Sequence, residues 1–136
     1  MVAKSTLWAR RNKAVVAQQD RERKGTLDGK LISLVSQSKY RSKQSGREHS
    51  INTEYLRGLY IGQEGKCALS GIKMTIIGER GSDDYWKSIS IDRIDSSKGY
   101  IEGNVQLVCT GVNYMKKDMT DTMFIDFCHK VVENFK

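Results

Sequence analysis

The sequence predicts a small α+β fold in which helices flank a strand, loop, strand and helix unit. Three observations support this prediction. Apolar residues recur at helical spacing before residue 62 and after residue 111, and two short segments between them alternate apolar with polar residues. The length of 136 residues suits one domain with an arm or tail, and 38% hydrophobic content is compatible with folding.

The positive charge lies in the first third of the chain. The net charge is +7, and residues 1–50 hold twelve Lys or Arg against four Asp or Glu, whereas residues 51–136 are nearly neutral. A basic segment joined to a near-neutral globular part is typical of proteins that contact phosphate backbones, although an anionic membrane surface also attracts it. We therefore expect nucleic acid to be the partner.

Several classes of protein are excluded by the composition. No segment approaches the about 18 consecutive apolar residues of a membrane span, and the N-terminus lacks the apolar stretch of a signal peptide. The three cysteines, Cys67, Cys109 and Cys128, are an odd number at wide spacing, which does not suit a secreted disulfide framework. We expect a soluble, cytoplasmic protein with reduced thiols and no contact with membranes.

The N-terminal part is predicted to be helical. Residues 4–24 contain helix formers and scattered apolar positions, which predicts a solvated helix or a segment that becomes ordered on a polyanion. Residues 27–45 show one apolar helical face, and basic residues crowd the far end. A further helix is expected to begin at Asn52 or Thr53, which are good capping residues, and to end at Gly62.

Two strands and two helices are predicted for the second half. Residues 87–94 (KSISIDRI) and 104–109 (NVQLVC) have strand character, and the connecting loop contains Gly99 and Gly103 as turn residues. A short helix should occupy residues 111–117, and Thr120 should begin a final one. The apolar residues of this final helix are predicted to belong to the core: Met123, Phe124, Phe127, Cys128, Val131, Val132 and Phe135.

Charged residues at the end of the first strand need a structural explanation. The strand runs into Asp92, Arg93 and Asp95, and charged groups beside a core are costly unless they are paired, solvated or bound to metal. Asp92 offers a carboxylate oxygen, and Asn113 on the following helix offers an amide oxygen. These two ligands, with water and phosphate oxygens, suffice for a magnesium ion.

The segment SIDRIDSSKGYIEGNVQLVCTGVNYMKK resembles the ββα-metal finger of HNH endonucleases, particularly the phage and mobile-element type. The resemblance covers about residues 66–128. In that family the first strand ends in Asp-His, the second begins with Asn, and the helix carries His or Asn; here these positions are Asp92-Arg93, Asn104 and Asn113. The resemblance implies an endonuclease that hydrolyses phosphodiester bonds in duplex DNA, as a nick or a double-strand break.

The resemblance also implies roles for individual residues. Asp92 and Asn113 would bind Mg²⁺ or another divalent cation such as Mn²⁺, while Asn104 braces the loop and orients the catalytic group. Residues 1–50 would form a basic helical DNA-binding arm, and residues 51–136 the HNH nuclease domain. Phosphate contacts are expected from the arm and from the short helix, through Arg41, Lys43, Arg47, Lys116 and Lys117.

The sequence departs from the HNH pattern at the general base, which is Arg93 instead of His. Because Arg stays protonated, it cannot accept a proton, but it can clamp the phosphate. His49 is our preferred candidate for the base, with His129 expected at the edge of the final helix's core face, and water activated on the metal is a further route. Asp95 would enter the site if the strand bends.

Zinc and assembly are two further expectations. Many HNH proteins resemble one another in carrying two Cys-x-x-Cys knuckles, but at Cys67 and Cys109 each second cysteine is missing, so we expect no structural zinc and two buried, neighbouring thiols. A homodimer or a larger phage or host assembly is compatible with the sequence, as is a location in the host cytoplasm. The alternative function is a catalytically impaired HNH scaffold that binds DNA or assists packaging.

Overall fold

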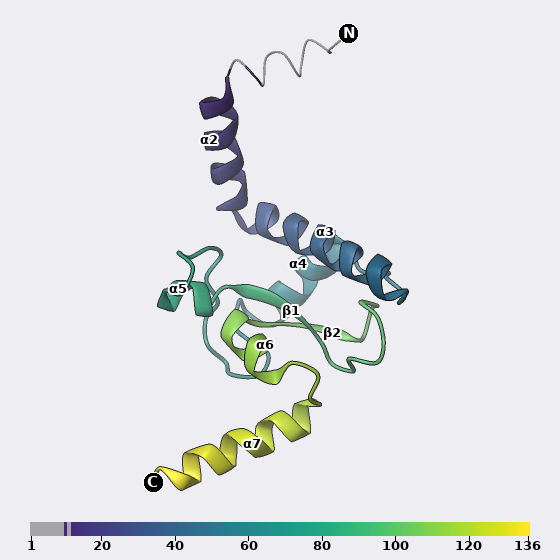
Figure 1. Ribbon diagram of the computed structural model, residues 1–136, viewed down its shortest axis with the longest axis vertical. Coiled ribbons are helices and arrows are strands. Elements are labelled where there is room, and N and C mark those ends of the chain that lie inside the picture. Colours follow the sequence, from purple (N-terminus) through teal and green to yellow (C-terminus); the bar gives the residue numbers. More distant parts are fainter. Residues whose placement is uncertain (1–9, 11) are drawn as a thin grey trace.

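The computed structural model describes residue 10 and residues 12–136, and it has the predicted α+β class (Figure 1). Six helices and one two-stranded antiparallel sheet make up this part of the chain. Residues 4–9 and 11 of the predicted arm lie outside the described residues. None of the described helices has the length and apolar composition needed to span a membrane.

Three helices form the N-terminal part. α2 spans Lys13–Lys24, and α3 spans Leu27–Ser45 as the periodicity predicts. The Thr26 hydroxyl caps α3 by accepting a hydrogen bond from the Gly29 amide at 3.0 Å, and Gly46 ends it in the left-handed region at φ 68°. α4 spans Thr53–Gly62, and the predicted cap is provided by Asn52.

The sheet is a hairpin of β1 (Ile89–Arg93) and β2 (Val105–Cys109). Its register pairs Ile91 with Leu107 and Asp92 with Gln106. α6 (Thr110–Lys116) follows β2 directly and packs against both strands of the hairpin. A short helix that the sequence did not predict, α5 (Asp83–Trp86), precedes β1 and is capped by Ser82.

The core lies between α3, α4, the hairpin and α6. Apolar residues at the predicted helical and alternating positions are buried there, and α3 crosses one face of the hairpin (Figure 1). The largest apolar side chains that are completely buried are those of Leu31, Leu56, Ile89, Leu107 and Val108. An ion pair between Arg57 and Asp28, 2.7 Å long, joins α4 to α3 at the surface.

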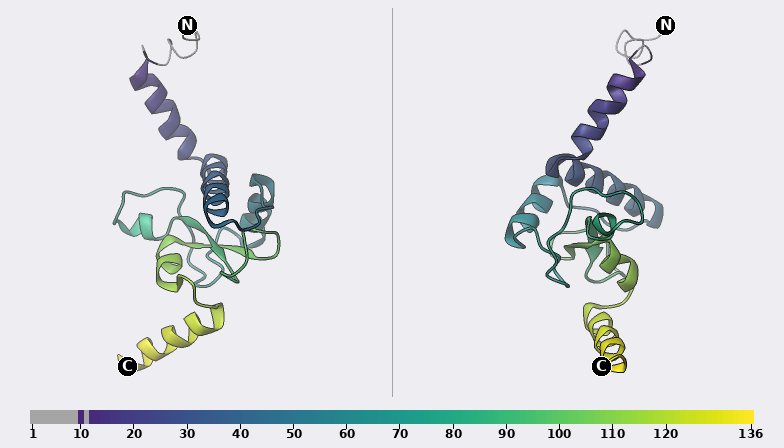
Figure 2. Two further views of the ribbon diagram at one scale, coloured as in Figure 1. Left: turned by 45° about the vertical axis from the view of Figure 1, so that its right-hand side comes forward. Right: turned by 90° about the vertical axis from the view of Figure 1, so that its left-hand side faces the viewer.

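The predicted role of the final helix in the core is wrong. α7 spans Asp121–Asn134 and projects from the body at the end opposite to α2 (Figures 1 and 2). Phe124 is its one buried residue, whereas the other predicted core residues, Cys128 among them, are exposed; Phe135 is 83% exposed. Helical spacing identifies an apolar face, but it does not say whether the rest of the chain covers that face.

Candidate functional site

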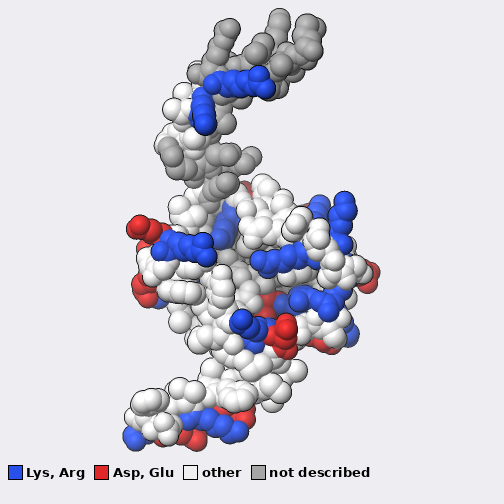
Figure 3. All heavy atoms as spheres, viewed as in Figure 1, with Lys and Arg blue, Asp and Glu red and all other residues white. Residues whose placement is uncertain are grey.

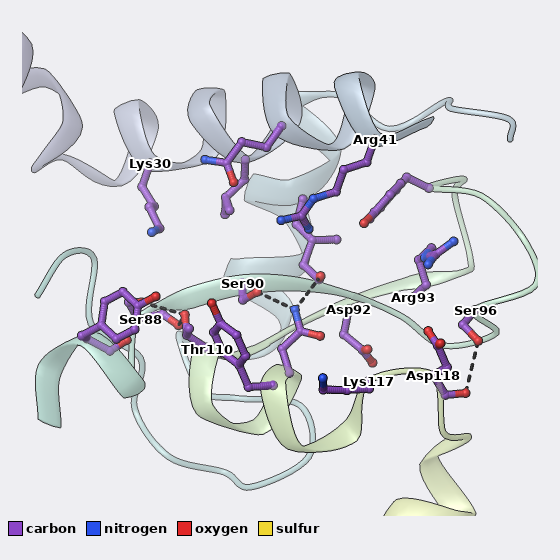
Figure 4. A pocket seen from close by; sticks show the side chains of 17 residues that line it. Lys30, Arg41, Ser88, Ser90, Asp92, Arg93, Ser96, Thr110, Lys117 and Asp118 are labelled. Atoms are coloured by element: carbon purple, nitrogen blue, oxygen red, sulfur yellow. Dashed lines mark hydrogen bonds between the residues drawn. The ribbon is translucent and has the colours of Figure 1, made fainter. Parts of the chain in front are cut away.

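A cleft of about 540 Å³ lies between α3 and α6, with β1 as its floor (Figure 4). On the face shown in Figure 3, Lys and Arg side chains surround the middle of the body. The charged residues that line the cleft comprise four cations and two carboxylates: Lys30, Arg41, Arg93, Lys117, Asp92 and Asp118. The excess of cations suits a polyanionic ligand.

Asp92 lies on the floor of the cleft and is only 2% exposed. One carboxylate oxygen, Oδ2, accepts hydrogen bonds from Lys116 Nζ at 2.6 Å and from Gln106 Nε2 at 2.9 Å. None of these contacts uses the other oxygen, Oδ1. The protein therefore fixes the carboxylate through one oxygen and leaves the second available to a ligand in the cleft.

Lys116 is fully buried behind Asp92, which corrects the prediction that it contacts phosphate. Its ammonium group donates to Asp92 Oδ2, to Asp121 Oδ1 at 2.8 Å and to the Arg93 carbonyl at 3.1 Å, so all three of its protons have acceptors. Burial disfavours its charge, but the hydrogen bonds and charges of Asp121 and Asp92 outweigh this and raise the pKa of Lys116.

Asn113 stands on α6 and faces the same cleft. Its Nδ2 donates to Ser90 Oγ at 2.6 Å and to the Ile91 carbonyl at 3.1 Å. Because a carbonyl oxygen can only accept, these contacts fix the orientation of the side-chain amide. The amide oxygen, Oδ1, makes neither contact and remains available as an acceptor or metal ligand.

The two oxygens, Asp92 Oδ1 and Asn113 Oδ1, are of the kind that hard divalent cations take as ligands. The buried cluster of Lys116, Asp92 and Asp121 has one more negative than positive charge, which favours a cation beside it. Within residue 10 and residues 12–136, no three His, Cys, Asp or Glu side chains lie together as a ligand group. A cation here would depend on one carboxylate, one amide, and oxygens from water or substrate.

Arg93 shares the cleft with Asp92 although neighbouring residues of a strand point to opposite faces. This is possible because Arg93 is the last residue of β1. Its guanidinium lies 5.2 Å from the centre of the Tyr100 ring and donates to the Lys98 carbonyl at 3.1 Å. Within the described residues it has no carboxylate partner, so its charge is available to a phosphate.

Asn104 holds the loop that follows β1. Its side chain accepts from the Asp95 amide at 2.9 Å and donates to the Asp95 and Gly99 carbonyls. Asp95 instead accepts hydrogen bonds from the hydroxyl and amide of Ser97, which lower its pKa, and it does not line the cleft. The loop is thus positioned by Asn104, and Asp95 belongs to the turn.

The structure does not bring either histidine to the cleft. His49 is bonded through Nε2 to Ser38 Oγ at 2.8 Å, and its backbone forms an isolated bridge with Tyr100. Burial, followed by the charge of Lys39, lowers the pKa of His49. His129 is exposed on α7. The position of His49 therefore argues against the general-base role predicted for it.

Only some of the residues predicted to contact DNA line the cleft. Arg41 and Lys117 line the cleft, whereas Lys43 and Arg47 are exposed at the end of α3 outside it. The sequence analysis did not identify Lys30, which also lines the cleft and precedes Arg41 by eleven residues on α3. Its signal was available, because residues eleven apart on a helix lie on nearly the same face.

Two of the three cysteines form a pair of neighbouring thiols. Cys67 and Cys109 are both buried, as predicted, and their side chains share a hydrogen bond. Burial, followed by the neighbouring Cys67, raises the pKa of Cys109 to about 11. Cys109 therefore remains a protonated thiol at neutral pH, and both buried side chains contribute to packing.

Comparison with known proteins adds no assignment. No protein family, curated protein or solved structure matches the chain. The functional assignment therefore depends on the geometry of the cleft and on the motif resemblance in the sequence.

Replacing Lys116 by Met should lower the free energy of unfolding by about 3–5 kcal/mol, because Asp92 is then left charged and buried. The double substitution Lys116→Met with Asp92→Asn should recover a large part of this loss. Urea unfolding of the wild type, Lys116→Met, Asp92→Asn and the double variant measures the effect. The pKa of Lys116 is raised by folding, so its stabilisation should persist through neutral pH and decline above about pH 10.4. A loss below about 1 kcal/mol for Lys116→Met would contradict the importance of the pair.

Proposed function

We propose that the protein is a metal-dependent endonuclease of the HNH type that hydrolyses phosphodiester bonds in DNA. The observation that carries the proposal is the convergence of Asp92 and Asn113 on one cleft, each with one oxygen unused by the protein. These residues occupy the two metal-ligand positions of the motif that the sequence resembles. The cations around them suit a phosphate backbone.

The residues present fit a magnesium or manganese ion. Asp92 Oδ1 and Asn113 Oδ1 would hold it, and the other positions would be occupied by water and substrate oxygens. When bound, such an ion polarises the scissile phosphate and stabilises the leaving oxygen. Lys116 and Gln106 keep the Asp92 carboxylate in place, and Ser90 does the same for the Asn113 amide.

Arg93 would bind a non-bridging oxygen of the scissile phosphate. Its planar group offers several donors, and among the described residues it contacts the Lys98 carbonyl and the Tyr100 ring, so it can add favourable charge where negative charge develops. Asn104 acts indirectly by holding the loop that follows Arg93. In this assignment Arg93 touches the substrate and Asn104 is a positioning residue.

The proton of the attacking water has no imidazole to receive it among the described residues of the cleft. Two carboxylates, those of Asp92 and Asp118, line the cleft. Without an imidazole, the proton of the attacking water would pass to solvent. This feature favours a second candidate function, in which the same scaffold binds DNA without turnover or assists packaging. The two candidates differ in whether DNA is cut when a divalent metal is supplied.

The purified protein should convert supercoiled plasmid to the nicked or linear form with Mg²⁺ or Mn²⁺, and EDTA should stop the reaction. Asn113→Ala and Asp92→Asn should each lower the rate at least a hundredfold while DNA binding is retained. Asp126→Asn, on the exposed part of α7, is the matched control and should cleave normally. Circular dichroism should check that each variant is folded. Intact plasmid with Mg²⁺, Mn²⁺, Ni²⁺ and Zn²⁺ would favour the binding function.

His49→Ala should retain cleavage within about threefold of the normal rate, because His49 lies outside the cleft. A general base contributes about 10²–10⁴ to a rate, so a loss of that size would restore His49 as the base. The rate must be measured below the unfolding temperature, since loss of the bond to Ser38 should destabilise the fold by about 1 kcal/mol. Ser38→Ala controls for that loss.

A further inference from the structure

The α3 wall of the cleft carries a row of side chains that the proposed cleavage reaction does not use. Lys30, Leu34, Gln37 and Arg41 follow one another at three- or four-residue spacing, and all four line the cleft. Such spacing places them on one face of the helix. At a rise of about 1.5 Å per residue, Lys30 and Arg41 are separated by about 16 Å along α3. Figure 4 shows both side chains pointing from α3 toward β1.

Three cations of the cleft lack the acidic partner that some cations elsewhere on the described body have. Arg57 and Lys87 are each paired with a carboxylate at 2.7 Å. Within the described residues, Lys30, Arg41 and Lys117 form no such ion pair. Lys30 is also partly buried, and this burial lowers its pKa. Its ammonium group has lost part of its hydration without gaining a counter-charge, which a phosphate group would supply.

The shape of the cleft distinguishes between paired and unpaired strands. Asp92 lies at the floor, 2% exposed, between two helical walls. A duplex strand on this floor would have the major groove on one side and the minor groove on the other. The major groove, about 12 Å wide, admits a helix about 10–12 Å across, but the other wall would then have to enter the minor groove, which is only about 6 Å wide. The volume of about 540 Å³ is in the range that encloses a ligand of nucleotide size. A single strand can lie between the walls without any groove having to admit them.

We propose that α3 seats one unpaired DNA strand, with Lys30 and Arg41 binding two of its phosphates while the scissile phosphate lies at Asp92 and Arg93. This deepens the proposed function and rests on it for the position of the scissile phosphate. The separation of about 16 Å corresponds to about five nucleotides at the duplex rise of about 3.4 Å, and to fewer in an extended strand. The substrate is single-stranded DNA or the unpaired strand of a branched DNA.

Aromatic residues of the cleft fit the same substrate. Tyr85 and Tyr114 line the cleft, their hydroxyl groups share a hydrogen bond, and Trp86 packs edge-on against both rings at 5.3 and 5.6 Å. The carbonyl of Tyr85 accepts the Ser88 hydroxyl, and Figure 4 shows Ser88 at the same end of the cleft as Lys30. Fixed aromatic rings beside a cation offer stacking surfaces to unpaired bases.

Binding of a fluorescent 12-nucleotide single strand, measured by anisotropy in EDTA, tests the proposal. Lys30→Gln and Arg41→Gln should each weaken binding about five- to tenfold and reduce the slope of log affinity against log salt by about 0.7. Lys39→Gln removes the same charge from α3 outside the cleft, and it should change affinity less than twofold. A mononucleotide at millimolar concentration should not displace the strand.

Equal losses for Lys30→Gln and Lys39→Gln would overturn the seat on α3, and displacement by the mononucleotide would overturn the strand assignment. The wild-type protein with Mg²⁺ should cut a branched substrate at its unpaired strand at least tenfold faster than the matched duplex. Faster cutting of the intact duplex would overturn the assignment of an unpaired strand. If nothing is cut but the binding pattern holds, the proposed function fails and the phosphate sites on α3 remain.

Discussion

The ion pair between Lys116 and Asp92 determines how the cleft is arranged. It joins the C-terminal end of α6 to the C-terminal end of β1, and through Asp121 it also fixes the start of α7. A lysine with three acceptors cannot move without leaving buried charges unpaired, so the three elements are held in one arrangement. This constraint keeps one oxygen of Asp92 turned toward the protein and the other free.

A division of charge gives the molecule its functional character. Behind the cleft, Lys116 forms ion pairs with two carboxylates, so its charge is not available to a ligand. In front of it, Lys30, Arg41 and Lys117 have no acidic partner within the described chain. On the proposed function, the cleft would combine a site for a small cation with surrounding charge for a polyanion, which is the combination that phosphodiester hydrolysis requires.

Much of the fold was predictable because its signals are local. The apolar spacing and the Thr26, Asn52 and Thr120 caps define three helices, and alternation defines β1. The exposed face of α7 was not predictable, since a period does not reveal what covers it. The burial of Lys116 depends on a contact 24 residues away in the chain. Its position three residues after Asn113 was the one local sign that it faces the site.

The central claim is that Asp92 Oδ1 and Asn113 Oδ1 jointly hold a divalent cation, and a crystal grown with Mn²⁺ tests it most directly. The anomalous difference map should show one strong peak within about 2–2.5 Å of both oxygens, with Lys116 still bonded to the other oxygen of Asp92. A map with no peak there, or with manganese bound only elsewhere on the protein, would contradict the account.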